Sequence, residues 1–155
     1  MTTGLVTATD IGTVTGTSSA LNTLAGNEGT TGNKVNLKAD VLVTVNDGTT
    51  TAAQLNTING MTSGLVTATA VTSISGSVSD FTTLAGNEAT EGDKVDLAAG
   101  VALTVTDAGS VAATDIATIN AMTSGLVTAT DIGTVTGTAS ALNTLAGNEA
   151  TEGDK

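Results

Sequence analysis

The feature that most constrains the fold is the repetition of the chain within itself. The segment "MTTGLVTATDIGTVTG" at Met1 returns as "MTSGLVTATAVTSISG" at Met61 and as "MTSGLVTATDIGTVTG" at Met122. Because one copy of such a repeat cannot bury a core alone, neighbouring copies are expected to stack on one another. The sequence predicts one array over residues 1–155, with repeats at 1–60, 61–121 and a shortened third copy at 122–155.

The third copy stops at "GNEATEGDK", where the second copy continues into "VDLAAGVALTVTDAGS". We therefore expect the chain to be a piece of a longer array, in which Met1 need not be a natural start. An array cut in this way exposes the apolar rim and strand edges that the next repeat would cover. We expect copies to associate end to end into fibres, and added salt to promote this by screening charge.

Within each long repeat lies a unit of ten residues that carries apolar side chains at its fifth and eighth places. A spacing of three favours a helical turn over a strand, whose faces alternate every two residues. We expect helices at 17–26, 51–60, 112–121 and 138–147, and strands or a mixed structure at 7–16, 67–76 and 128–137. The copies of the unit start at Thr7, Thr17, Thr51, Thr67, Ser77, Ala112, Thr128 and Thr138.

The ends of these units resemble helix caps. A Thr or Ser followed three residues later by Asp or Gln is typical of a capping box, and Gly at the tenth place can end a helix in the left-handed conformation. This places Asp10, Asp80, Asp115 and Asp131 at capping positions rather than in a reactive site. The predicted boxes are Thr7 with Asp10, Thr51 with Gln54, Ser77 with Asp80, and Thr128 with Asp131.

Other segments alternate apolar and polar residues, which is the pattern of a strand. These are "KVNLKADVLVTVND" (34–47) and "KVDLAAGVALTVTD" (94–107), and "GLVTAT" is a shorter candidate. Strands, turns and short helices in this order predict a β-solenoid with short helical segments in its coils; the alternative is a mixed α/β solenoid. The residues expected to face inward are Leu21, Leu24, Ile58, Phe81, Leu84, Ile116, Ile119, Leu142 and Leu145.

The composition excludes several functions. The chain has no His, Cys or Arg, and its Ser residues have no neighbouring base, so we expect no enzyme activity and no catalytic residues. A net charge of −11 argues against nucleic acid as a partner, which requires clustered Lys or Arg. No apolar run approaches the roughly 20 residues of a membrane span.

Two kinds of ligand site remain as alternatives. Acidic loops could hold calcium, but the first loop has Thr31 and Asn33 where the second has acids, so solvated turns are the simpler interpretation and no cofactor is expected. Thr-x-Thr pairs could instead form an ordered array that binds ice or carbohydrate, although outward Thr is also simply a good strand residue. The candidate calcium ligands are Glu88, Glu91, Asp93, Glu149, Glu152 and Asp154.

The motif "TDIxTI", followed by "GLVTAT" and "TLxGNE", resembles the Thr-, Ala- and Asp-rich repeats of very large surface proteins of cyanobacteria, green sulphur bacteria and related aquatic bacteria. The resemblance covers the whole chain and implies a β-solenoid in a cell-surface layer or adhesin, with an extracellular or cell-surface location. We therefore expect a structural shaft or spacer segment. The alternative is a surface binding module, either a calcium-stabilised adhesin segment or a Thr-array binder.

Overall fold

The computed structural model describes residues 4–28, 34–88 and 94–149, and within these it has twelve short strands and five helices. The strands are β1 (Val6–Ala8), β2 (Thr13–Gly16), β3 (Val35–Leu37), β4 (Leu42–Val45), β5 (Thr49–Thr51), β6 (Val66–Ala68), β7 (Ser73–Gly76), β8 (Val95–Leu97), β9 (Ala102–Val105), β10 (Ser110–Ala112), β11 (Val127–Thr128) and β12 (Thr134–Thr136). The helices are α1 (Ser18–Ala25), α2 (Ala52–Gly60), α3 (Val78–Glu88), α4 (Ala113–Ala121) and α5 (Ala139–Glu149).

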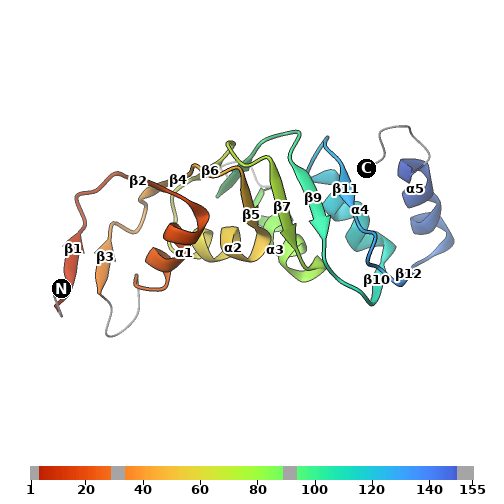
Figure 1. Cartoon of the computed structure of the whole chain (residues 1–155), viewed down its shortest axis with the longest axis horizontal. Helices are drawn as coiled ribbons and strands as arrows, with labels where there is room; N and C mark the ends of the chain where they lie inside the picture. The colour runs from red at the N-terminus through yellow and green to blue at the C-terminus, as the bar shows by residue number, and fades with distance from the viewer. Residues whose placement is uncertain (1–3, 29–33, 89–93, 150–155) are drawn as a thin grey trace.

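Each of the first two long repeats folds as two structural units, and the described part of the third folds as one. Each unit is a set of strands followed by one helix. Units 1, 3 and 5 have two strands (β1–β2, β6–β7 and β11–β12), whereas units 2 and 4 have three (β3–β5 and β8–β10). The units follow one another along the long axis, from β1 at one end to α5 at the other, and successive helices pack together (Figure 1). The units are therefore stacked in a row, and each is about half as long as the sequence period.

All paired strands are parallel, but the pairing step alternates between a long and a short one. The long step joins unit 1 to unit 2, where Thr13 lies opposite Leu42. The short step joins unit 2 to unit 3, where Val43 lies opposite Val66. Strand β4 therefore pairs with the second strand of unit 1 on one side and with the first strand of unit 3 on the other. As a result, the pairing shifts by one strand within the unit at each short step.

The predicted β-solenoid is wrong, and so is its mixed α/β alternative. The described strands form four separate parallel sheets of two or four strands, beside a row of five helices, and they close no coil. The strand pairing gives the reason. At the short step, the second and third strands of one unit pair with the first and second strands of the next, β4 with β6 and β5 with β7, so each sheet ends after at most four strands. The architecture is an open α/β array.

The helices and strands lie where the local patterns predict them. The segments 17–26, 51–60, 112–121 and 138–147 form α1, α2, α4 and α5, as expected. The strand patterns at 34–47 and 94–107 form β3 with β4, and β8 with β9. The mixed segments 7–16 and 67–76 contribute strands, because Thr, Val and Ile dominate them.

The predicted core is confirmed in the centre of the array and fails at its end. The predicted residues Leu21, Ile58, Phe81, Leu84, Ile116 and Ile119 are buried. Leu24 and Leu145 are only partly buried, and Leu142 is 38% exposed, so the prediction for Leu142 is wrong. Leu142 lies on α5, which is covered by α4 on one side and by no further helix among the described residues.

Two of the four predicted capping pairs form, each at the N-terminus of a helix. At α2, the Thr51 hydroxyl accepts from the Gln54 backbone N–H and the Gln54 side chain accepts from the Thr51 backbone N–H, which completes the box. At α3, the Ser77 hydroxyl accepts from the Asp80 backbone N–H at 3.1 Å and donates to the Asp80 carboxylate at 2.7 Å. Both pairs satisfy N–H groups that the first turn leaves without helical partners.

The other two predicted boxes are wrong. Thr7 and Thr128 lie in strands that pair with neighbouring units, and Asp10 and Asp131 lie in the turns that follow. Asp115 is in the first turn of α4, whose N-cap residue makes no side-chain hydrogen bond.

The tenth-place glycines do not take the left-handed conformation. Gly26 caps α1 with a φ of −69°, and Gly60 lies inside α2, so the predicted helix ends are wrong in this respect. Gly76 has a packing role instead, because a Cβ there would lie 2.9 Å from the Cβ of Ala52. The missing side chain lets the end of β7 approach the start of α2.

Candidate functional site

Two rows of outward hydroxyl groups run across the four-stranded sheets. Parallel strands about 4.8 Å apart hold matching residues side by side, so a Thr at the same place in each strand forms a row. The first hydroxyl row is Thr15, Thr44 and Thr67, each opposite the next, and it ends at Asp96. The second hydroxyl row is Ser75, Thr104 and Thr128; it begins beside Thr51, whose hydroxyl caps α2 instead.

The burial of neighbouring residues shows that both rows face away from the core. In the first row, Thr44 and Thr67 are partly exposed, while Val43 and Val66 beside them are buried. In the second row, Thr104 is partly exposed, while Leu103 and Val105 beside it are buried. Sequence reasoning found the Thr-x-Thr pairs but could not place them, since a row takes members from different strands through the alternating step.

Two aspartates that sequence reasoning missed link one unit to the next. The Asp47 carboxylate accepts from the Ser18 backbone N–H at 3.0 Å and from the Ser18 hydroxyl at 2.7 Å, so it caps α1 from the following unit. Asp107 accepts from the backbone N–H of Val78 at 2.7 Å and does the same for α3. A carboxylate is favoured at a helix N-terminus by the free N–H groups and the helix dipole. The only sequence signal was the Asp that ends each of the two strand patterns.

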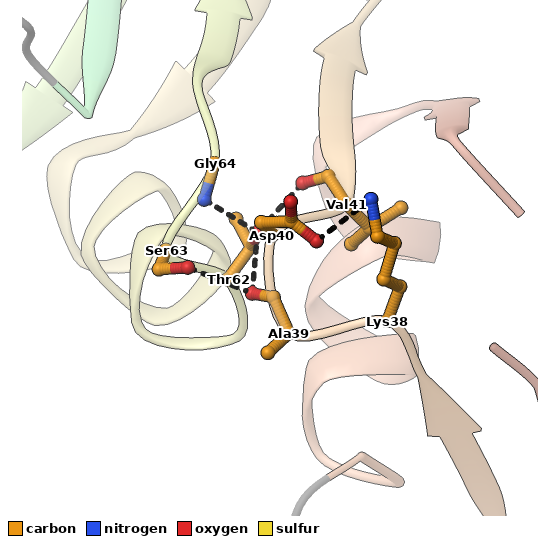
Figure 2. A network of polar contacts seen from close by, with 7 residues as sticks. All are labelled: Lys38, Ala39, Asp40, Val41, Thr62, Ser63 and Gly64. Carbon is orange, nitrogen blue, oxygen red and sulfur yellow. Dashed lines mark hydrogen bonds and ion pairs between the residues drawn. The ribbon is translucent and has the colours of Figure 1, made fainter.

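A second link between units is a clamp at the start of the "MTSG" motif. The buried Thr62 hydroxyl donates to the Val41 carbonyl at 2.6 Å, and it accepts from the Gly64 backbone N–H at 2.9 Å. Figure 2 shows this group seated against the turn that holds Lys38 and Asp40. The Lys38 ammonium lies 3.1 Å from the Asp40 carboxylate and lowers its pKa by hydrogen bonding.

The same clamp recurs one long period later. The Thr123 hydroxyl donates to the Val101 carbonyl at 2.6 Å and accepts from the Gly125 backbone N–H at 2.8 Å. At Gly64, a Cβ would lie 2.6 Å from the Asp40 carbonyl oxygen, so only glycine fits. These polar groups therefore hold the fold together and are not free to bind a ligand.

Two of the six predicted calcium ligands, Glu88 and Glu149, lie among the residues that the structure describes. Glu88 and Glu149 are the last residues of α3 and α5, and they belong to different units. Within residues 4–28, 34–88 and 94–149, no three acidic side chains gather in a way that could hold a metal ion. The remaining four candidates, Glu91, Asp93, Glu152 and Asp154, lie outside the described residues.

Comparison with known proteins gives no relative. No family model matches the chain, and neither a curated protein nor a solved structure matches it. Among the described helices, none is long and apolar enough to cross a membrane.

Proposed function

We propose that this chain is a surface binding module of an extracellular or cell-surface protein, and that the two hydroxyl rows are its binding surface. The observation that carries the proposal is the strand register, which places Thr15, Thr44 and Thr67 side by side on one sheet. The resemblance to repeats of large bacterial surface proteins supports the location, and the acidic composition supports a ligand other than nucleic acid.

The chemistry of the rows suits a ligand that is itself a repeating array of hydroxyl groups. Each Thr or Ser hydroxyl can donate one hydrogen bond and accept others, and the Thr methyl group beside it supplies a small apolar contact. Neighbouring hydroxyls in a row are about 4.8 Å apart because the strands are. Because the sheets hold these side chains at a fixed spacing, binding avoids much of the entropy cost of ordering them. We therefore propose polysaccharide chains as the ligand of this module.

The test is binding of polysaccharides by affinity electrophoresis and by pull-down on insoluble polymers. The triple variant Thr15→Val, Thr44→Val and Thr67→Val removes the first row's hydroxyls while keeping side-chain volume and strand preference. We expect it to bind at least tenfold more weakly than the wild-type chain. Equal binding by the two proteins, or no binding by either, would refute the proposal, and ice shaping without polysaccharide binding would assign the rows to ice.

The control for this test is a second triple variant in which the lost hydroxyls lie on helices. Thr23, Thr57 and Thr118 are exposed, and each donates its hydroxyl to the carbonyl four residues earlier in its own helix. Their replacement by Val removes the same number of hydroxyl groups from the surface. We expect this control to bind as the wild-type chain does.

A structural spacer that associates end to end is the second candidate function. It is favoured by the linear order of the five units, which places β1 and α5 at opposite ends of the array (Figure 1). Light scattering and negative-stain microscopy across a salt series test it. Fibres that grow with salt would support the spacer, because screening weakens the repulsion between chains of net charge −11. A monomer at high concentration and high salt would contradict it.

A further inference from the structure

The two ends of the array expose apolar residues whose counterparts in central units are buried. At the N-terminal end, Val6 is 45% exposed, whereas Val66, its counterpart in the second long repeat, is fully buried. At the C-terminal end, Val135 is 36% exposed, whereas its counterpart Ile74 is fully buried. By contrast, Leu65 is 39% exposed in a central unit, so exposure there is a property of the repeat and not of the end.

The strands at both ends also have unpaired edges among the described residues. β1 and β2 are each the first strand of a sheet, and β11 and β12 are each the outermost strand at the other end. Such edges present backbone N–H and carbonyl groups that can pair with another strand. The N-terminal face is defined here as β1 and β2, and the C-terminal face as β11, β12 and the exposed side of α5.

The way in which unit 4 covers unit 3 shows what would fit the C-terminal face. There β8 pairs with β6 and β9 pairs with β7, so that Val66 lies opposite Val95 and Ser73 lies opposite Ala102. Unit 5 offers the same two strands as unit 3, with β11 and β12 in place of β6 and β7. A partner must therefore supply two strands whose starts are offset along the chain as those of β8 and β9 are.

We propose that the C-terminal face binds the N-terminal face of a second copy of this chain. Strands β1 and β2 start at Val6 and Thr13, the same offset as between Val95 and Ala102, and they carry Val6, Ala8 and Val14 where β8 and β9 carry Val95, Leu97 and Leu103. In the complex β1 pairs with β11 and β2 pairs with β12, parallel, with Val6 opposite Val127 and Thr13 opposite Thr134. The inference rests on the end-to-end association proposed above and specifies its contact.

The contact is heterologous, so it adds copies without closing a ring of two. This contact lacks the helix cap that units 2 and 4 provide within the chain, where Asp47 and Asp107 accept hydrogen bonds from the start of the preceding helix. At the matching place, unit 1 has Ser18 instead of an aspartate. The N-terminus of α5 therefore receives no carboxylate from the second copy. The association is accordingly weaker than packing within the chain, and it depends on protein concentration.

Two variants that each block one face give the decisive test by analytical ultracentrifugation at high salt. Val6→Asp blocks the N-terminal face and Val135→Asp blocks the C-terminal face; both side chains are substantially exposed, and circular dichroism checks that each variant folds. We expect each variant alone to be monomeric and an equimolar mixture to give a species of twice the monomer mass. The control Leu65→Asp should assemble as the wild-type chain does.

The outcomes separate the two proposals. If the wild-type chain never associates, the end-to-end function and this contact both fail. If the wild type associates but Val6→Asp still forms dimers or longer species alone, the association is not head to tail and only the contact proposed here is wrong.

A cysteine pair tests the register. The chain has no cysteine, so Thr7→Cys with Thr128→Cys introduces a single designed pair, which this register places opposite one another in adjacent chains. Oxidation should link the chains into a ladder of multimers, because neighbouring parallel strands are close enough for a disulfide. The pair Thr7→Cys with Thr130→Cys, which is out of register, should link at least tenfold less, and equal linkage by both pairs would overturn the register.

Discussion

The contrast between two identical helix sequences gives the sharpest stability prediction. Residues 19–28 and 140–149 share the sequence "SALNTLAGNE", yet Leu21 is 2% exposed and Leu142 is 38% exposed. Replacing Leu21 by Ala removes a buried side chain and should lower the free energy of unfolding by about 2–5 kcal/mol. Replacing Leu142 by Ala should cost only about 1 kcal/mol, because the side chain is already partly in water and leaves no closed cavity.

The measurement is urea unfolding followed by far-ultraviolet circular dichroism, since the chain has neither Trp nor Tyr for fluorescence. Dilute protein at low salt keeps the chains apart, so that Leu142 is not covered by a second copy. Helix propensity cancels, because the same substitution is made in the same local sequence. Equal losses at the two sites would show that local sequence rather than the neighbouring unit sets the stability of these helices, and would refute the packing argument.

Three further predictions concern the links between units and the acidic loops. Asp47→Ala should cost about 1–2 kcal/mol of stability by removing the cap of α1, whereas Asp10→Ala, in an exposed turn, should cost almost nothing in the same urea titration. Gly64→Ala should cost about 1–3 kcal/mol because its Cβ meets the Asp40 carbonyl, whereas Gly60→Ala, with open space around it, should be neutral or stabilising. The thermal midpoint should be the same with chelator and with millimolar calcium; a rise of many degrees with calcium would show that the acidic loops bind the ion.

Local sequence predicted which segments form helices and strands because the apolar spacing differs between them. The prediction failed where the same local pattern occurs both at a helix N-terminus and in a strand. Ser77 with Asp80 starts a helix, but Thr7 with Asp10 does not, because Gly12 disfavours a helix and the β-branched residues after Asp10 favour a strand. The pairing of Thr7 with Asn36 of the next unit then holds this segment in the sheet.

The solenoid prediction failed because the packing of units is not encoded in any one segment. The chain alternates a long step, as from Thr13 to Leu42, with a short step, as from Val43 to Val66, and the short step moves the pairing to a different strand of the unit. The sequence period, from Met1 to Met61, is longer than the two steps together and reveals neither of them. The Thr-rich character of the candidate site was therefore visible, while its rows and the caps formed by Asp47 and Asp107 were not.

The alternating step is the central claim, because both hydroxyl rows depend on it, and disulfide trapping measures it directly. The structure places Thr44 opposite Thr67, so the Thr44→Cys and Thr67→Cys pair should form an intramolecular disulfide on mild oxidation. If the long step applied between all units, Thr44 would instead lie opposite Ser73, which the structure pairs with Thr49 and Ala102. Rapid linkage of the Thr44→Cys and Thr67→Cys pair is the predicted result, with little for Thr44→Cys and Ser73→Cys, and the opposite preference would contradict the account.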